Sequence, residues 1–460
     1  MATSQKKPTF ASYMKTITGR WSLTWCCSGL HFLVDALCVC CLFLLADEFP
    51  SGDFVGVFMT YNVLAFLTQP LTGMLADRLT DRHYLLLGTA VLLLSLAVMT
   101  ASAATAFRWS AEAVMLTVAI LAGMGNSLFH VWGGKLTAVR TENDGRALGV
   151  FVSTGAFGLA VGIFFHSWLL LYVLLLLIVL LAVRVNPLLT LQPSNGVGAD
   201  YSKSQTRWRE AWVWLGILVL MGLVMLRSLV GETFSAGIDK GLYSVLLIGG
   251  VAMIGKMSGG WIARWMGAIT ALLAVVVTIV VCMLLKQWGQ GMLWAGLLLV
   301  NLTMAITLYL ANKLMRGSEG LAFGLLAATL MPGYLLAQFS TTWSTVLPSL
   351  LLTLVPTIII ELGVLWLLRE HRASVLWPAV VINILTNVPL NLYITYVSDS
   401  WTTIIVAEIL IIIVEALWYH YFVRNLRLAA IYSVLCNGMS FFLGLLVQLL
   451  LVYFGININL

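Results

Sequence analysis

The stretch Gly73-Met74-Leu75-Ala76-Asp77-Arg78-Leu79-Thr80-Asp81-Arg82 is a short charged loop between two long apolar runs. One run, over residues 54–76, precedes the charged residues, and the other, over residues 83–104, follows them. Each run reaches the length of about 20 residues that a helix needs to cross a bilayer. Alternation of apolar runs with short charged loops is typical of a polytopic membrane protein, because only helices or closed barrels satisfy their backbone in hydrocarbon. The loop and its neighbours therefore predict helices that span a membrane.

The composition extends this prediction to the whole chain. Of the 460 residues, 61% are hydrophobic and only 10% are charged. A soluble domain carries about 25% charged residues. One core cannot bury so much apolar surface, so the composition excludes an ordinary soluble protein and requires lipid around the chain.

Candidate spans can be located by length and apolar content. The N-terminal 20 residues are polar and basic, and the run after them is long enough to be a first transmembrane helix rather than a cleaved signal peptide. Fifteen candidate spans follow from this reasoning, at residues 23–46, 54–76, 83–104, 113–138, 147–166, 167–186, 211–231, 242–262, 266–285, 291–312, 320–340, 343–368, 374–397, 402–423 and 428–454.

The basic residues give an orientation. With the N-terminus in the cytoplasm, the predicted outside segments hold only Arg108, Lys240 and Lys286, while most of the 25 Lys and Arg residues fall in inside segments. This bias obeys the positive-inside rule. It predicts a multi-pass protein of a bacterial inner membrane with a cytoplasmic N-terminus and an external C-terminus.

The longest polar stretch divides the chain. We predict a six-helix bundle over residues 1–186, a cytoplasmic linker over 187–210, a second six-helix bundle over 211–370 and an additional three-helix region over 371–460. An internal repeat supports the division. The repeat aligns the loop at Gly73 with Gly259-Gly260-Trp261-Ile262-Ala263-Arg264, and it aligns Gly145, Ala147, Gly149 and Gly158 with Gly320, Ala322, Gly324 and Gly333 at a constant offset of 175.

The loop from Gly73 to Arg82 resembles the G-x-L-a-D-R-x-G-R-R loop of the major facilitator superfamily. The resemblance covers about residues 20–370 and implies two six-helix bundles around a central site. It also implies that the loop braces helix ends during conformational change, through Gly73, Asp77, Arg78 and Arg82 and, in the second copy, Gly259 and Arg264. The sequence departs from the family where Thr80-Asp81 replaces Gly-Arg and where Ala263 replaces the second acid.

Two further segments resemble the fosmidomycin-resistance type of drug exporter within that superfamily. They are His31-Phe32-Leu33-Val34-Asp35 and Gly123-Met124-Gly125-Asn126-Ser127-Leu128-Phe129-His130. This resemblance implies proton-coupled efflux. Residues 374–460 lie outside the twelve-span pattern.

Ionisable side chains inside predicted spans cost free energy to insert into the bilayer, so each one indicates a possible functional role. His31 and Asp35 are four residues apart and share one helix face, where a histidine–carboxylate pair can exchange a proton near neutral pH. With Glu361 of the twelfth span they are our candidate proton-coupling residues. The alternative for His31 and Asp35 is a structural pair that locks the first helix.

A second group of polar residues could face a central cavity. Arg227 is a permanent charge within a span and must face water, an acid or an anionic ligand. The candidate substrate-binding residues are His130, Arg227, Asn126, Tyr61 and Asn301. The alternative for His130 is a buried histidine with a backbone partner, and for Tyr61 and Asn301 it is polar contact between helices. For Arg227 it is a lock with Asp35 or Glu361.

The C-terminal region carries two acids, Glu408 and Glu415, seven residues apart on one helix face. Structural docking, regulation and a separate proton or ion path are the hypotheses for these tail acids. The seven cysteines fit small apolar packing better than disulfides, and we predict no metal site.

We predict an all-α secondary transporter and not an enzyme, because the sequence contains neither a nucleophile constellation nor a nucleotide-binding phosphate loop. The expected partners are a small organic substrate of anionic or drug-like class, protons and lipid, with no nucleic acid, nucleotide or cofactor. Efflux by proton antiport is the first hypothesis. Proton-coupled uptake of a nutrient or metabolite is the second, and a non-transporting membrane enzyme or sensor that uses the C-terminal region is the third.

Overall fold

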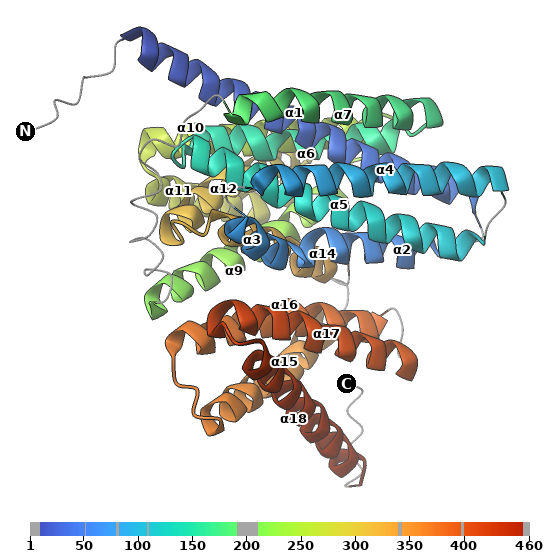
Figure 1. Ribbon diagram of the computed structural model, residues 1–460, viewed down its shortest axis with the longest axis vertical. Helices are drawn as coiled ribbons and strands as arrows, with labels where there is room; N and C mark the ends of the chain where they lie inside the picture. Colours follow the sequence, from blue (N-terminus) through green and yellow to red (C-terminus); the bar gives the residue numbers. More distant parts are fainter. Residues whose placement is uncertain are drawn as a thin grey trace, which may run out of the picture. The chain divides into compact units, whose positions relative to one another are not determined.

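The computed structural model describes residues 10–50, 52–79, 82–107, 110–190, 210–338, 343–396 and 400–453, and these residues form helices without any strand (Figure 1). The predicted linker lies largely outside the described residues. The helices are α1 (Phe10–Glu48), α2 (Phe54–Asn62), η1 (Val63–Leu67), α3 (Gln69–Arg78), α4 (His83–Phe107), α5 (Ala111–Arg140), α6 (Gly145–Phe164), α7 (Trp168–Thr190), α9 (Ala211–Gly237), α10 (Ser244–Met266), α11 (Ala268–Leu284), η4 (Lys286–Trp288), α12 (Gln290–Leu314), α13 (Glu319–Ala328), α14 (Leu330–Gln338), α15 (Trp343–Leu367), α16 (Ala373–Tyr396), α17 (Trp401–Val423) and α18 (Leu426–Tyr453).

The helices are those of a membrane protein. Thirteen helical segments are long and apolar enough to cross a bilayer, and the shorter apolar helices Ala268–Leu284 and Leu354–Leu367 complete the set among the described residues. Each of the fifteen predicted spans corresponds to one of these segments. The prediction of an all-α polytopic protein is confirmed.

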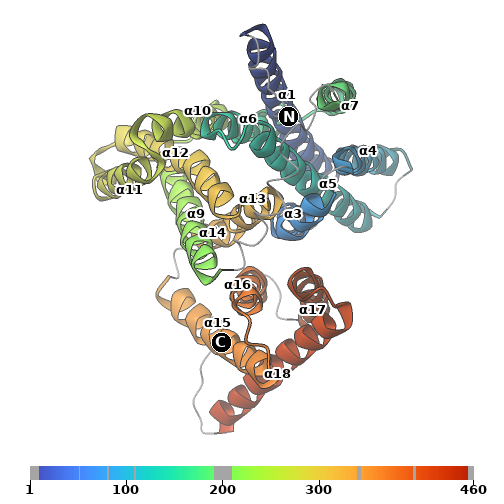
Figure 2. The same cartoon turned by 60° about the vertical axis from the view of Figure 1, so that its left-hand side comes forward.

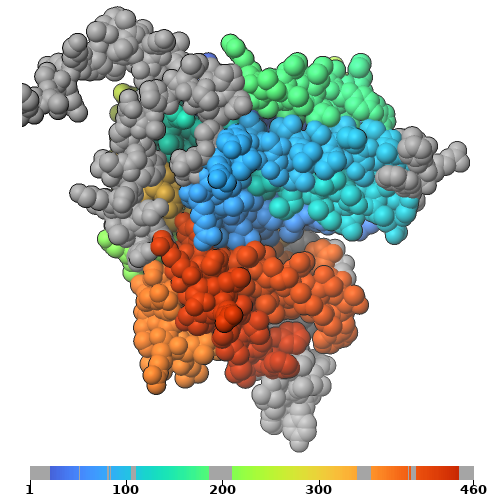
Figure 3. Space-filling view, in the orientation of Figure 1, coloured from blue at the N-terminus to red at the C-terminus, as the bar shows by residue number. Residues whose placement is uncertain are grey.

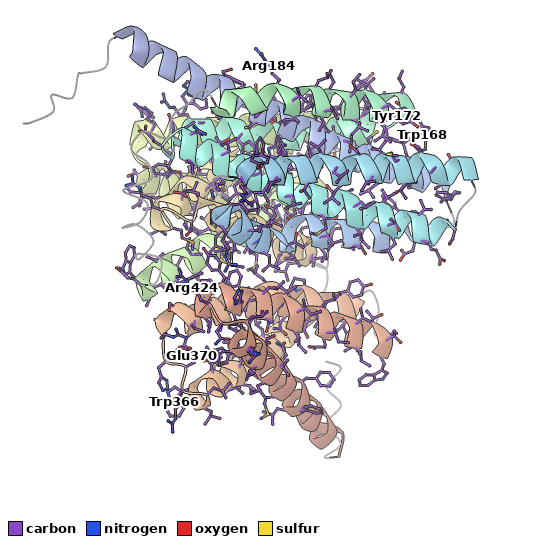
Figure 4. The ribbon with its side chains drawn as sticks, viewed as in Figure 1. Trp168, Tyr172, Arg184, Trp366, Glu370 and Arg424 are labelled. Carbon is purple, nitrogen blue, oxygen red and sulfur yellow. The ribbon has the colours of Figure 1, made fainter. Side chains whose placement is uncertain are left out.

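Large apolar side chains face outward, as lipid contact requires. On α7, which lies at the surface in Figure 3 (green), Leu176 is 58% exposed and Val183 is 67% exposed. Trp168 and Tyr172 lie near one end of this helix and Arg184 lies toward the other (Figure 4). Aromatic rings at one end and a cation at the other are the anchors that hold a spanning helix between two interfaces.

Two spans are interrupted, and each interruption precedes a proline. A proline clashes with the carbonyl four residues before it and supplies no backbone N–H. Span two continues from α2 into the π-helix η1 before Pro70. Span eleven divides into α13 and α14 at Thr329, three residues before Pro332.

The described residues form two compact units. Unit 1 contains residues 1–65, 79–200 and 234–313, and unit 2 contains residues 66–78, 201–233 and 314–460. Within unit 1, α6 packs against α1 and against α10 (Figure 2). Within unit 2, α3 packs against α13, and α15, α16, α17 and α18 form a helical group of their own (Figure 2). Each unit thus combines segments from both predicted halves, and the domain boundaries stay a prediction.

The internal repeat in the sequence corresponds to two similar helix crossings in the structure. In unit 2, a Cβ on Gly73 would meet the backbone of Gly320, and a Cβ on Gly324 would meet the backbone of Gln69. In unit 1, a Cβ on Gly260 would meet the backbone of Gly145. A Cβ on Gly149 would meet the carbonyl oxygens of Lys256 and Met257 at 3.1 and 2.9 Å. Only glycine permits such close backbone approach.

These contacts correct the alignment of the repeat by one residue. The counterpart of Gly73 is Gly260, not Gly259, because Gly260 is the residue that packs on the start of the partner helix. Gly259 instead lies against the backbone of Leu302 on α12. The counterpart of Asp77 is therefore Arg264 rather than Ala263. Spacing alone could not separate two adjacent glycines on one helix.

Candidate functional site

Five predicted site residues form one polar cluster in unit 1. His31 and Asp35 come from α1, Tyr61 comes from the end of α2, and Asn126 and His130 come from α5. Nε2 of His31 lies 3.2 Å from Oδ2 of Asp35, and Nε2 of His130 lies 3.5 Å from Oδ1 of the same carboxyl group. Asn126 donates its amide N–H groups to Oδ1 of Asp35 at 3.0 Å and to the Tyr61 hydroxyl at 3.1 Å.

The backbone fixes which nitrogen of each imidazole carries a hydrogen. Nδ1 of His31 lies 2.7 Å from the carbonyl oxygen of Phe151, and Nδ1 of His130 lies 2.9 Å from the carbonyl oxygen of Asn126. A carbonyl oxygen only accepts, so both Nδ1 atoms must donate. A neutral imidazole then presents a bare lone pair at Nε2. Both bare positions face the Asp35 carboxyl group.

This geometry is satisfied only when a hydrogen lies between the imidazoles and the carboxyl group. With Asp35 ionised and both histidines neutral, lone pairs would face lone pairs at 3.2 and 3.5 Å. A proton on Nε2 of either histidine turns the contact into a charge-assisted hydrogen bond. The cluster is thus built to hold at least one proton beyond the ionised-carboxylate, neutral-imidazole state.

Burial keeps water away from the cluster, so water molecules cannot supply the missing hydrogen bonds in place of that proton. His31, Asp35, Asn126 and Tyr61 are each between 3% and 6% exposed, and the His130 side chain is 11% exposed. The ring of Phe151 stacks on the His31 ring with centroids 4.8 Å apart. In a poorly hydrated site a change of charge is strongly felt by neighbouring groups. Gain or loss of one proton therefore changes the energy of the whole cluster.

Two glycines allow the helices to form this cluster. A Cβ on Gly155 of α6 would collide with Oδ2 of Asp35 and Nε2 of His31. A Cβ on Gly123 of α5 would lie 2.8 Å from Cβ of Leu64 and 2.9 Å from the carbonyl oxygen of Tyr61. Gly123 therefore brings α2 against α5, which places the Tyr61 hydroxyl beside Asn126. The π-helix that follows Tyr61 is a local feature common at functional sites.

The donor types also suit a metal ion. One atom from each of His31, Asp35 and His130 lies within 4.8 Å of the others. Two imidazoles and a carboxylate are a ligand set that first-row divalent metals accept. The sequence did not show this capacity, because His130 is distant in the chain from the His31–Asp35 pair.

The charged segment predicted as a loop begins inside α3, and its acid caps another helix in unit 2. The Asp77 carboxylate accepts hydrogen bonds from the backbone N–H groups of Gly320 and Leu321, each at 2.9 Å, at the start of α13. A carboxylate there satisfies free N–H groups and favours the positive end of the helix dipole. Arg78 lies over the ring of Tyr421 on α17, 5.1 Å from the centroid. Arg82 is exposed.

The equivalent helix start in unit 1 is capped differently. Asp144, the N-cap of α6, accepts from the backbone N–H of Arg146 at 2.9 Å and from the Arg146 guanidinium at 2.6 Å. Burial raises the pKa of Asp144, but the Arg146 hydrogen bonds and the nearby Arg264 charge outweigh it and lower the pKa overall. The acid thus caps its own helix, and Arg264, in the last turn of α10, adds an attracting charge to that of Arg146.

The other predicted site residues lie elsewhere. Asn301 is buried on α12 and donates to the Leu297 carbonyl oxygen at 2.8 Å. Arg227 lies on α9 in the part of the helix that belongs to unit 2. Glu361 is fully buried on α15 in unit 2 and accepts from Asn383 at 2.7 Å. Glu415 on α17 is fully buried, and Glu408 on the same helix is partly exposed.

Sequence reasoning missed the neighbours that shape the cluster. Phe151 supplies a carbonyl oxygen and an aromatic face, and Gly155 supplies the space. A backbone carbonyl has no residue signature. Gly155 could have been suspected from the small residues of its span, since glycine at helix crossings is common in membranes. The seven cysteines are all free.

No family model and no curated protein matches this sequence. Among solved structures, a variant of the E. coli fucose:proton symporter FucP is similar to it, with a TM-score of 0.50 and 14% sequence identity. The match covers 78% of this chain and 97% of the symporter chain. The chain has the major facilitator fold. At this identity the likeness concerns the fold alone, and it supports a multi-pass integral membrane protein with the fold class predicted from the loop at Gly73.

Proposed function

We propose that the chain is a secondary active transporter that moves a small organic molecule across the membrane and exchanges a proton at the His31–Asp35–His130 cluster. The observation that carries the proposal is the orientation of both Nε2 atoms toward one buried carboxyl group while both Nδ1 atoms are held by carbonyl oxygens. The major facilitator fold supplies a scaffold suited to alternating access.

The cluster joins proton binding to substrate binding through shared groups. Asn126 and Tyr61, which we predicted as substrate-binding residues, are hydrogen-bonded to each other and to Asp35 through the Asn126 amide. A substrate group that accepts from the Asn126 amide removes a hydrogen-bond partner from Asp35, and one that displaces the Tyr61 hydroxyl disturbs the same amide. Loss of that partner changes the affinity of the carboxyl group and its two imidazoles for a proton. The two ligands are thereby linked, and such linkage is reciprocal.

The direction of transport follows from the sign of this linkage. If the substrate displaces the proton, the two alternate and the protein is an antiporter, which is the efflux hypothesis. If the substrate stabilises the protonated cluster, both move together as in uptake. Displacement is favoured, because Nε2 of His130 faces Asp35, and a substrate group that takes this atom competes directly with the proton that it would carry. The localisation in a bacterial inner membrane with an inside N-terminus stays part of the proposal.

The test is flux in proteoliposomes that contain a pH-sensitive dye and the purified full chain. Organic anions, sugars and lipophilic drugs are added in turn, and the internal pH is followed. We expect at least one compound to move protons in the wild type and not in Asp35→Asn or His130→Gln. Asp239→Asn, at an exposed loop position, is the matched control and keeps the flux. Substrate movement that proceeds equally in Asp35→Asn would contradict the proposal.

A divalent metal is the competing occupant of the cluster. Zn²⁺ and Ni²⁺ are added to the same protein, first alone and then together with an organic compound that moves protons. Under the proposal they inhibit proton movement without being transported. Accumulation of either ion in the vesicles, with no response to any organic compound, would replace the organic substrate by a metal ion.

A further inference from the structure

A continuous hydrogen-bonded chain in unit 2 joins two buried acids on different helices. Glu361 on α15 accepts from Nδ2 of Asn383 on α16 at 2.7 Å, and Oδ1 of Asn383 accepts from Nδ2 of Asn387 at 3.0 Å. Asn387 in turn reaches the Thr386 hydroxyl oxygen at 3.4 Å. The Thr386 hydroxyl donates to Oε1 of Glu415 on α17 at 3.1 Å.

The fourth helix of the group closes the network. Asn437 on α18 donates to Oε2 of Glu415 at 2.5 Å, and the neighbouring Cys436 thiol donates to the backbone carbonyl of Glu361 at 3.6 Å. Each of α15, α16, α17 and α18 thus contributes a polar group. Interior polar contacts on all four helices are more than packing of an apolar tail requires, since lipid-facing helices associate through small apolar contacts as well.

The charges in this network are all of one sign. Glu361 and Glu415 are both 0% exposed. Among the described residues, the charged groups acting on them are each other and Glu408, and the titratable neighbours Tyr419 and Cys436 are neutral groups. Two ionised carboxylates without a cation are too costly to bury together, so such a pair keeps a proton or takes a cation.

Two buried oxygens mark where a ligand can bind. The hydroxyl of Tyr419 and Oε1 of Glu361 have no hydrogen-bond partner within 3.5 Å among the residues that the structure describes, although the Ser440 side chain also acts on the Glu361 carboxyl group. Tyr419 is fully buried, lies four residues after Glu415 on the same helix and interacts electrostatically with both acids. Buried polar groups left open in this way are uncommon and point to a ligand position.

We propose that Glu361 and Glu415 form a second proton-binding site, in which the two carboxyl groups, connected by the Asn383–Asn387–Thr386 chain, together hold one proton. The site is separate from the His31–Asp35–His130 cluster and does not depend on it. Because all four helices contribute to the network, binding of the proton affects the packing of α15, α16, α17 and α18 together. In this proposal the ligand of Glu415 is a proton, and the acid that acts with Glu415 is Glu361 rather than Glu408.

Infrared spectroscopy of the purified full chain tests this site, because a protonated carboxylic acid has a carbonyl band separate from that of a carboxylate. We expect the wild type to show this band at neutral pH and to lose it in alkali. Glu361→Gln and Glu415→Gln each keep the side-chain shape and amide contacts, and each should remove the band. Glu112→Gln, at an exposed acid of α5, is the matched control and retains it. Circular dichroism and gel filtration confirm that each variant folds.

Two further arms separate this site from the other cluster and from metal binding. Asp35→Asn should leave the band unchanged, so a failure of the transport proposal does not imply failure here. Replacement of choline chloride by sodium chloride should also leave it unchanged. Absence of the band in wild type at neutral pH, its survival in both glutamine variants, or its loss on addition of Na⁺ would each overturn the shared proton.

Discussion

The guanidinium of Arg78 lies over the ring of Tyr421, 5.1 Å from the ring centroid. The first residue belongs to the charged loop at the end of α3, and the second belongs to α17 of the additional C-terminal region. A side chain of the additional region is thus held directly against the segment for which the resemblance predicts a helix-bracing role. The neighbouring Asp77 caps α13 at the same place.

Removal of the Tyr421 ring should weaken this contact. Tyr421→Leu is expected to cost about 0.5–1 kcal/mol, the range of an exposed cation–π pair. Hydrogen exchange measured by mass spectrometry should then rise in α3 and at the start of α13. Tyr421→Phe keeps the ring over Arg78 and loses only the hydrogen bond of the hydroxyl with Ser318, so exchange in α3 should stay closer to the wild type than in the leucine variant. Equal exchange in the leucine and phenylalanine variants would show that the ring contact carries no stabilisation.

Loss of the Asp77 carboxylate should loosen the start of α13. Asp77→Ala removes the acceptor of two backbone N–H groups and a favourable charge at the helix end, which we expect to cost about 1–2 kcal/mol of stability. Asp77→Asn keeps one oxygen acceptor without the charge and should lie between alanine and wild type. Thermal unfolding in detergent measures the order. Alanine and asparagine variants as stable as the wild type would exclude a capping role.

Gly155→Ala should damage the His31–Asp35–His130 cluster directly. The added methyl group has no room beside Oδ2 of Asp35 and Nε2 of His31, so the pair must separate. Misplacement of such groups can cost roughly a hundredfold in rate. Gly88→Ala on α4 is the matched control, because nothing lies within 4 Å of its added Cβ. Proton flux in proteoliposomes should fall in the first variant alone; an equal fall in both would point to a general helix effect.

Acid should destabilise unit 2 through Glu370, which lies between α15 and α16. Burial raises the pKa of this carboxyl group, but hydrogen bonds from the side chain and backbone of Arg372 outweigh burial and lower the pKa from its ordinary value of 4.5. The Tyr432 hydroxyl donates to it as well, at 3.2 Å. Figure 4 places Glu370 at one end of this helical group.

The sign follows from the lowered pKa. The stabilisation is present above pH 4.5 and is lost as the pH falls through the lower pKa of the folded protein. Glu370→Gln should therefore lower the unfolding temperature at neutral pH and flatten its decrease in acid. Thermal unfolding between neutral pH and pH 3 measures both effects. An unchanged acid profile in Glu370→Gln would contradict the assignment.

The fold could be predicted from sequence because lipid imposes a simple rule on length and apolar content. The fifteen spans follow from that rule, and the charged loop at Gly73 supplies the superfamily resemblance. The pair His31–Asp35 was also accessible, since residues four apart share a helix face. What joins His130 to that pair is a crossing of α1 and α5, which no local pattern contains.

The remaining features depend on packing between distant segments. The contact of Gly260 with Gly145, rather than of Gly259, is a matter of helix rotation, and adjacent glycines give no clue to it. The Phe151 carbonyl oxygen that fixes the His31 tautomer is a backbone atom and would be present with any residue. Glu361 and Glu415 were recognised as separate acids, and only the fold shows the Asn383–Asn387–Thr386 chain between them.

The protons on the two imidazoles can be observed without knowledge of the substrate. Nitrogen NMR of the full chain labelled with ¹⁵N-histidine, with His31→Gln and His130→Gln for assignment, reports each ring nitrogen as the pH is changed. We predict that both Nδ1 atoms keep their hydrogen throughout, that an Nε2 atom gains and loses one, and that Asp35→Asn alters this titration while Asp239→Asn does not. Unprotonated Nδ1 atoms, or Nε2 atoms that never titrate in the wild type, would contradict a proton-exchanging cluster.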